Sequence, residues 1–169
     1  MNKALIAFGA NLGKPVDAFS EALADLDGVS AVSGVWQSPA WPPGSSAPDY
    51  LNMAAIVKTP DEPAEVLARL HDIERRAGRE RGVRNASRTL DLDLIGLGQR
   101  VETRAALTLP HPRMEGRGFV LLPLSQIAAD WRHPVSGLTV MEMLSRLPLA
   151  EVAPMRYLGR VVALPGDSH

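Results

Sequence analysis

The first half of the chain alternates short apolar runs with longer segments in which apolar residues recur every three to four positions. Residues 4–8 form a continuous apolar run that ends at Gly9, the pattern of a buried strand. From Pro15 onward the apolar residues follow helical spacing, and Gly28 is a suitable stop. The pattern predicts a strand, a helix that starts at Pro15, and then a short strand over 31–36.

The next segments show the clearest periodicity. Strict alternation over residues 50–58 predicts a strand with Tyr50 and Asn52 on one face and apolar residues on the other. A helical stripe follows from about residue 61 or 62 to 77, with Pro63 in its first turn and Gly78 after its end. Another strand is predicted over 89–97.

Two loops and a less regular remainder complete the chain. Residues 38–49 are rich in proline and glycine, which predicts a long surface loop, and loops of this length in compact domains are often functional. A second loop covers 79–87. Three further elements are expected: a hairpin near 98–104, a helical stretch after 117, and a short helix near 139–147.

The order strand, helix, strand, strand, helix, strand predicts an α/β (α+β) two-layer sandwich of the ferredoxin-like kind. We expect a mainly antiparallel sheet with flanking helices on one side. A chain of 169 residues is long enough for one domain with a real core, and no repeat or linker divides it. We therefore expect a single domain over 1–169, with the tail after about 159 unassigned.

Composition narrows the functional classes. Apolar residues make up 46% and charged residues 22%, which is ordinary for a soluble globular protein, and a net charge of -1 favours neither nucleic acid nor a membrane surface as partner. The absence of cysteine excludes disulfides, thiolate metal sites and cysteine nucleophiles. No signal peptide is recognised and no apolar run approaches ~18 residues. We expect a cytoplasmic protein.

The strongest local signal is the run Arg88-Thr89-Leu90-Asp91-Leu92-Asp93-Leu94-Ile95. On a strand, Asp91 and Asp93 share one face with their bases about 6.5–7 Å apart, while the leucines point into the core. Two such carboxylates repel unless a cation or a proton joins them. Mg²⁺ is commonly held by one or two carboxylates and substrate phosphates. A D-x-D pattern alone is equally typical of a solvated strand face.

Arginines gather just upstream of this run, and Glu80 is the only acid among them. They are Arg75, Arg76, Arg79, Arg81, Arg84 and Arg88. The planar guanidinium matches phosphate oxygens, so arginines beside metal-binding carboxylates indicate phosphoryl transfer. We assign phosphate contact to Arg79, Arg81 and Arg88. The pair at 75 and 76 is assigned to a solvated helix end, and position 84 stays open.

Two other segments carry weaker signals. Residues 9–15 have some likeness to a phosphate-binding loop, but the spacing is one residue short and Pro15 stands where serine or threonine is required. In the segment 109–119, His111 lies between prolines, where it can contact phosphate, carry a proton or serve a structural role. Phe119, from its sequence context alone, is assigned to the core.

Tyr50 and Asn52 share a strand face beside the loop 38–49. A buried asparagine requires hydrogen-bond partners, and its amide edge can read a heteroaromatic ring on which a tyrosine stacks. An asparagine satisfied by backbone groups at a bulge is an equal alternative.

Together these residues resemble the 6-hydroxymethyl-7,8-dihydropterin pyrophosphokinase (HPPK) family, from residue 7 to the His133-Pro134 region. The matching segments, in this order, are Ala7-Phe8-Gly9-Ala10-Asn11-Leu12-Gly13, Pro48-Asp49-Tyr50-Leu51-Asn52, Gly78-Arg79, Arg88-Thr89-Leu90-Asp91-Leu92-Asp93 and Leu109-Pro110-His111. The resemblance implies a monomer that transfers pyrophosphate from ATP to the hydroxymethyl oxygen of the pterin in folate biosynthesis. The oxygen would attack the β-phosphorus in line, and AMP would leave.

The resemblance also implies site residues. Asp91 and Asp93 would ligate two Mg²⁺ ions and form the catalytic set with Arg79 and Arg88. The pterin-binding residues would be Ser38, Trp41, Tyr50, Asn52 and Phe119, with Tyr50 and Phe119 sandwiching the ring, which replaces the core assignment of Phe119. The ATP-binding residues would be Glu74, Arg79, Arg88, Leu94 through its backbone, Thr108, His111 and Arg117. Arg81, which the arginine pattern assigns to phosphate, joins this set.

The chain departs from many relatives at two positions. The loop Asn85-Ala86-Ser87 is about one residue shorter and lacks the tryptophan found before the position of Arg88. Pro112 stands where many relatives carry tyrosine. Both positions bear on ATP affinity and on closure of the loops 38–49 and 79–87, and neither belongs to the pterin pocket.

Two other classes share part of this pattern. A palm-like nucleotidyltransferase also holds two metals with carboxylates on an antiparallel sheet, but it requires a third acid and a basic template groove. A ferredoxin-like ligand-binding module would tolerate Asp91→Asn and Asp93→Asn, and would leave the arginine loop without a function.

Overall fold

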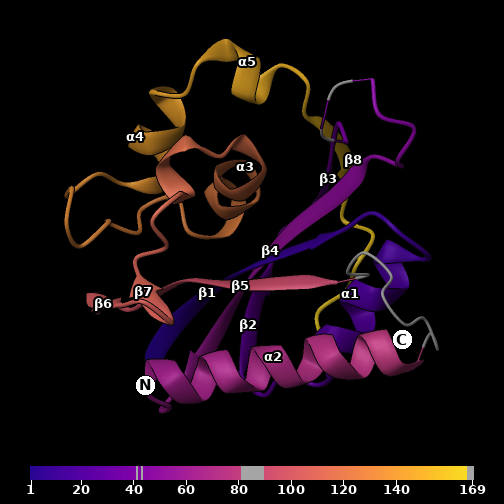
Figure 1. Cartoon of the computed structure of the whole chain (residues 1–169). Coiled ribbons are helices and arrows are strands. Elements are labelled where there is room, and N and C mark those ends of the chain that lie inside the picture. Colours follow the sequence, from indigo (N-terminus) through magenta and orange to yellow (C-terminus); the bar gives the residue numbers. More distant parts are fainter. Residues whose placement is uncertain (41, 43, 81–89, 167–169) are drawn as a thin grey trace.

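A central antiparallel sheet organises the molecule (Figure 1). The computed structural model describes residues 1–40, 42, 44–80 and 90–166, without the side chains of Arg79 and Glu80. The sheet has the order β5-β1-β4-β3-β8, and β2 also pairs with β4. Its strands are β1 (Asn2–Ala10), β2 (Val29–Val32), β3 (Val35–Ser38), β4 (Tyr50–Thr59), β5 (Asp91–Leu97) and β8 (Arg156–Gly159).

Helices form some of the connections between these strands. The helices are α1 (Pro15–Ala24), α2 (Pro63–Glu80), α3 (Gly118–Ile127), α4 (Val140–Ser145) and α5 (Leu149–Val152), with a short 3₁₀ turn η1 (Met114–Gly116). A separate hairpin joins β6 (Glu102–Arg104) to β7 (Leu107–Leu109). Since α1 links β1 to the β2–β3 edge and α2 links β4 to β5, the predicted ferredoxin-like antiparallel sheet with flanking helices is confirmed.

Helices cover both faces of the sheet. Below the sheet in Figure 1, α1 and α2 pack on a large apolar cluster that includes Phe19, Leu70 and Leu92. Above it, α3 and α4 pack on a smaller cluster that includes Ile56 and Leu121. The expectation of helices on one side only was wrong, because the segment after residue 117 forms a second helical layer.

Strand β4 follows the predicted alternation. Ala54 and Ile56 lie in the cluster under α3, whereas Met53 and Ala55 lie in the cluster under α1 and α2. Asn52 shares the face of the first pair, as the period of two requires.

The strand predicted over 31–36 is interrupted. The Ser33 hydroxyl accepts a hydrogen bond from the Ala54 backbone nitrogen at 2.8 Å, so a side chain replaces the ladder contact there. Gln126 Oε1 on α3 accepts a hydrogen bond from the Gly34 nitrogen at 3.0 Å. These contacts divide the strand into β2 and β3.

Several boundaries also differ from the predictions. Helix α2 continues past Gly78 to Glu80, because a glycine with an ordinary helical neighbourhood need not end a helix. The expected hairpin near 98–104 lies a few residues later, at β6 and β7. The tail is structured as well: β8 pairs with β3, and Val162 is buried in the larger cluster.

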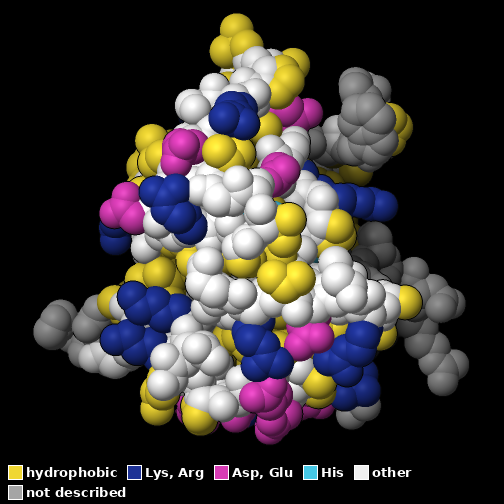
Figure 2. Space-filling view, turned by 90° about the vertical axis from the view of Figure 1, so that its left-hand side faces the viewer, with side chains coloured by type: hydrophobic (Ala, Val, Ile, Leu, Met, Phe, Trp, Pro, Cys, Tyr) yellow, Lys and Arg dark blue, Asp and Glu magenta, His cyan; other side chains and the backbone are white. Residues whose placement is uncertain are grey.

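Charges are mixed on the side of the molecule that carries β6 and β7. Lys and Arg side chains are interspersed there with Asp and Glu (Figure 2). Arg100, for example, pairs with Glu62 at 2.9 Å and with Glu102 at 3.1 Å. No single sign of charge dominates this side. Among the described residues, no helix has the length and apolar character that a membrane span needs.

Candidate active site

Polar residues of β4 and β5 lie in one row across the sheet, with a glycine of β1 between them. Gly9 on β1 is the partner of Asn52 on β4 and of Asp91 on β5. In the next row, Ala7 is the partner of Ala54 and of Asp93. Because Gly9 has no side chain, nothing from β1 rises between the amide and the carboxylate.

The amide of Asn52 is buried and held in place. Only 4% of this residue is exposed. Its Nδ2 donates to Ser38 Oγ at 2.9 Å and to the Trp36 carbonyl at 3.4 Å. Its Oδ1 faces Gly9, since a Cβ built on Gly9 would lie 3.9 Å from it. Two bonds to β3 therefore fix the orientation in which the amide faces the row.

Asp91 and Asp93 lie on the same face of β5, as predicted. Asp93 is exposed and Asp91 half-buried, while Leu90, Leu92 and Leu94 are buried on the opposite face. The described residues contain no group of three or more His, Asp or Glu side chains arranged around one metal position. Two carboxylates on one strand face fit Mg²⁺, which is commonly bound by one or two carboxylates together with waters and substrate phosphates.

Glu74 and His111 contact the backbone of β5. Glu74 Oε2, on α2, accepts a hydrogen bond from the Leu92 nitrogen at 3.0 Å. The His111 nitrogen donates to the Ile95 carbonyl at 2.8 Å. These bonds attach helix α2 and the segment before η1 to the strand that carries the aspartates.

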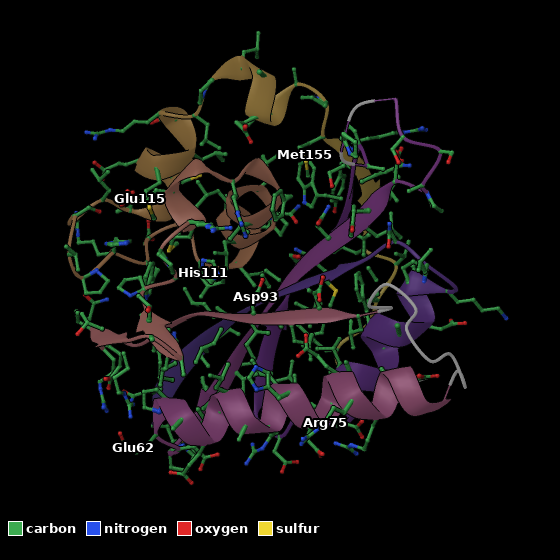
Figure 3. The ribbon with its side chains drawn as sticks, in the orientation of Figure 1. Glu62, Arg75, Asp93, His111, Glu115 and Met155 are labelled. Atoms are coloured by element: carbon green, nitrogen blue, oxygen red, sulfur yellow. The ribbon has the colours of Figure 1, made fainter. Side chains whose placement is uncertain are left out.

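The hydrogen bond at Nδ1 of His111 leaves Nε2 as the donor of the neutral imidazole. Its Nδ1 accepts a hydrogen bond from the Arg113 nitrogen at 3.2 Å, so the proton of the neutral ring resides on Nε2. Burial lowers the pKa of His111; the Asp93 charge opposes this shift, and the Arg117 and Arg113 charges add to it. Figure 3 shows His111 and Asp93 in the space between β5 and α3.

Phe119 lies in the first turn of α3 and is 38% exposed. The assignment to the core from sequence context was wrong, because the helix turns this ring outward. The Arg117 guanidinium carbon lies 5.4 Å from the ring centroid, within the range of a cation–π contact. Tyr50, at the start of β4, is half-buried and is the strand partner of Ser38. Tyr50 therefore lies two residues before Asn52 on β4, on the same strand face.

The loop between β3 and β4 is tied at its base by residues that sequence reasoning missed. Asp49 accepts hydrogen bonds from the Ala40 nitrogen at 3.3 Å and from Gln37 Nε2 at 3.1 Å. Asn11 Nδ2 donates to the Pro48 carbonyl at 3.4 Å. The signals were present, since Asn11 and Asp49 both lie in the segments that carry the family resemblance. Within the segment 9–15, residues 11–14 connect the end of β1 to the start of α1, so the segment is a turn from strand to helix, as predicted.

The other predicted residues are more scattered. Arg75 and Arg76 form ion pairs with Asp72, and Arg76 also with Asp25. Figure 3 shows Arg75 on α2. Thr108 is exposed on β7 and donates to the Arg104 carbonyl. Leu94 has a buried side chain, and its predicted role concerns the backbone. Trp41, Arg81, Arg84, Arg88 and the Arg79 side chain lie outside the described residues.

Comparison with protein families supports one assignment. Residues 5–129 match the model of a family described as 7,8-dihydro-6-hydroxymethylpterin-pyrophosphokinase (HPPK). A 2-amino-4-hydroxy-6-hydroxymethyldihydropteridine pyrophosphokinase of Synechocystis sp. is 38% identical over 157 residues, covering 90% of this chain and 80% of the relative. An enzyme of the same name from Haemophilus influenzae is 37% identical over 141 residues, covering 80% and 88%.

Solved structures share the fold. The chain resembles Plasmodium falciparum HPPK-DHPS crystallised with pterin and p-hydroxybenzoate, with a TM-score of 0.72 and 13% identity over 92% of this chain. It spans only 46% of that longer protein. At this level of identity the likeness concerns the fold alone.

Proposed function

The chain belongs to the 7,8-dihydro-6-hydroxymethylpterin-pyrophosphokinase (HPPK) family, and from this premise we propose how its residues perform the reaction. The protein transfers pyrophosphate from ATP to 6-hydroxymethyl-7,8-dihydropterin in folate biosynthesis, giving AMP and the pterin diphosphate. Our proposals concern the residues that bind, the metal and the order of events at the reacting atoms.

The pterin is held at the β3–β4 end of the row. Asn52 Nδ2 donates to Ser38 and Trp36, which fix the orientation of the amide, so Oδ1 is the atom that accepts a hydrogen bond from an N–H donor of the pterin. Tyr50 and the exposed Phe119 stack on the two faces of the ring. Backbone groups near Ser38 and Trp41 complete the contacts.

Two Mg²⁺ ions would be held by Asp91 and Asp93 together with ATP phosphates. The pair of carboxylates on one strand face provides hard oxygen ligands, and phosphates and water complete the coordination. When bound, such ions offset the negative charge of the polyphosphate.

The phosphates extend from the aspartates toward α3. His111, neutral and with its proton on Nε2, donates to a phosphate oxygen. Arg117 adds a guanidinium beside it. We assign Glu74, Thr108 and the backbone of Leu94 to the nucleotide. The assignments of Arg79, Arg81 and Arg88 to phosphate rest on the sequence.

The reaction requires orientation more than a protein base. The hydroxymethyl oxygen forms a bond to the β-phosphorus while the bond from that phosphorus to the oxygen bridging to the α-phosphorus breaks. AMP leaves with the bridging oxygen, and the hydroxyl proton passes to solvent. Asn52 and the two stacking rings set the oxygen in line, and fixed donors at His111 and Arg117 stabilise the charge that spreads over the phosphate oxygens.

The single observation that supports this proposal most is the row Asn52–Gly9–Asp91, in which the Asn52 amide and the Asp91 carboxylate lie on either side of a glycine, with only β1 between their strands. The test is AMP formation from ATP with and without the hydroxymethyldihydropterin, in Mg²⁺ and after chelation. We expect AMP release that depends on both the pterin and Mg²⁺. Pyrophosphate in place of AMP would instead indicate a nucleotidyltransferase.

Three further expectations stay proposals. We propose that residues 1–169 act as one domain, that the enzyme is a monomer, and that it works in the cytoplasm. Size-exclusion chromatography with light scattering tests the monomer directly.

A further inference from the structure

Residues 149–159, here called the C-terminal strap, cross from the helical layer to the far edge of the sheet (Figure 1). The strap comprises α5, a short connection and β8. It lies outside residues 5–129, the part of the chain that the family model matches. We infer that the C-terminal strap is a positioning element of the pterin site, which sets the distance between Phe119 on α3 and Asn52 on β4. This inference rests on the proposed pterin site.

At its first end the strap presses on the residue between Arg117 and Phe119. A Cβ built on Gly118 would lie 2.2 Å from the carbonyl oxygen of Glu151, a distance that real Cβ atoms do not reach. Backbone therefore packs directly on backbone where α3 begins. The ring of Phe119, the next residue along the chain, is exposed in the first turn of α3.

At its other end the strap extends the sheet beside the residues that orient Asn52. Tyr157 on β8 is the strand partner of Trp36, and their rings lie 4.8 Å apart between centroids. The same tyrosine occupies the space above Gly34, where a Cβ would come within 2.4 Å of its ring. Trp36 in turn is the strand partner of Asn52 and accepts a hydrogen bond from its amide.

One continuous segment thus touches both walls of the pterin site. Figure 3 places Met155 at the crossing, between α5 and β3. The two walls are otherwise joined through Gln126 of α3, which accepts hydrogen bonds from the Gly34 nitrogen and from Trp36 Nε1. A shift of the strap moves Phe119 relative to Asn52, and stacking and hydrogen bonding to one rigid ring cannot tolerate such a shift.

The first experiment compares two glycines that flank Arg117. Gly118→Ala places a methyl group against the Glu151 carbonyl, whereas Gly116→Ala places one in open space with no atom within 4 Å. We expect Gly118→Ala to raise the dissociation constant for the hydroxymethyldihydropterin by about 10- to 100-fold. ATP affinity should change less than about twofold, and Gly116→Ala should bind the pterin like wild type.

A second pair tests the other end of the strap. Tyr157→Ala removes the ring that packs on Trp36, and the control Leu158→Ala alters the adjacent exposed residue. We expect Tyr157→Ala to raise the dissociation constant for the pterin about tenfold and Leu158→Ala to leave it unchanged. The pair also provides an answer if Gly118→Ala does not fold.

Binding is measured by pterin fluorescence well below the thermal midpoint of each variant, so that loss of stability alone leaves the dissociation constant unchanged. Pterin affinity equal to wild type in folded Gly118→Ala, or in Tyr157→Ala should the first not fold, would overturn the inference while leaving the proposed function intact. Failure of wild type itself to bind the pterin would overturn the proposed function and this inference together.

Discussion

The two faces of the central sheet come from the same strands but have opposite characters. On the face under α1 and α2, side chains from β1, β4 and β5 form a closed apolar cluster. On the other face, α3 and α4 cover only the part that holds residues such as Leu5 and Ile56. Beyond this cover the same strands present Asn52, Asp91 and Asp93.

The difference separates core packing from the proposed site within one element. On β5, consecutive residues alternate between the two faces, so Leu92 packs in the core and Asp93 lies on the face of the proposed site. A substitution of Leu92 should therefore lower stability with little effect on catalysis, and a substitution of Asp93 should lower catalysis with little effect on stability.

The largest expected effect is loss of catalysis in Asp93→Asn. Removal of a metal-ligating charge should lower kcat about 10³-fold, or ~4 kcal/mol of barrier, because the phosphate charge is less well offset. Stability should hold or rise slightly, since Asp93 is exposed and one of two like charges disappears. Steady-state AMP formation and thermal unfolding measure the two properties. Asp72→Asn, on the outer side of α2, is the control, and full activity in Asp93→Asn would contradict the site.

Leu92→Ala should have the opposite result. This side chain is 2% exposed, and its truncation leaves a cavity, so we expect the free energy of unfolding to fall by about 3 kcal/mol. Urea denaturation measures this loss. Leu149→Ala is the control, because Leu149 is 76% exposed and should change stability by less than about 0.5 kcal/mol. A Leu92→Ala variant as stable as wild type would contradict the placement of Leu92 in the closed apolar cluster under α1 and α2.

Asn52→Ala tests a polar residue buried on the functional face. The pterin should lose its amide partner, so we expect the pterin KM to rise about 10- to 100-fold, equivalent to ~1–3 kcal/mol. The KM for ATP should stay within about twofold. The control is Asn2→Ala. Asn2 is an exposed asparagine at the other end of β1 from Gly9. Equal rises in both substrate KM values would indicate a structural role instead.

The smallest expected effect is on thermal stability and concerns the N-terminal cap of α4, one of the helices packed on the same side of the sheet as the proposed site. Thr139 and Glu142 form a capping box, and hydrogen bonds from Thr139 lower the pKa of Glu142 below its ordinary value of about 4.5. The charged form thus contributes stability above that pH and loses it as the pH falls through the lower folded value. The thermal midpoint of wild type should exceed that of Glu142→Gln at pH 7, and the gap should shrink below about pH 4.

A background variant isolates the part that the Thr139 hydroxyl plays. Thr139→Ala keeps the backbone N–H that donates to Glu142 and removes only the hydroxyl, so the further change Glu142→Gln should have a somewhat smaller effect at pH 7 than in wild type. An equal effect in both backgrounds would show that the backbone N–H accounts for the stabilisation and the hydroxyl for none of it.

Much of the fold and part of the site were predictable from local patterns. The alternation over β4 and β5 correctly separated Asn52 from Met53 and the aspartates from the leucines. The break at Ser33 and Gly34 was not predictable, because it depends on Ala54 and Gln126, which are distant in sequence. The ties of Asp49 and Asn11 to the β3–β4 loop were missed for the same reason, since a single polar side chain does not reveal its partner.

The sequence by itself determined which residues share a face, because the period of a strand is a property of the local backbone. It also determined the chemistry available on β5, where acids alternate with leucines. Only the tertiary structure decided which face stays open, since that depends on where α3 and α4 come to rest. The strand register likewise sets Asn52 and Asp91 on either side of Gly9, with β1 between them, and register depends on contacts between residues distant in sequence. The same holds for β8, whose pairing with β3 depends on contacts made by the whole chain rather than by its own few residues.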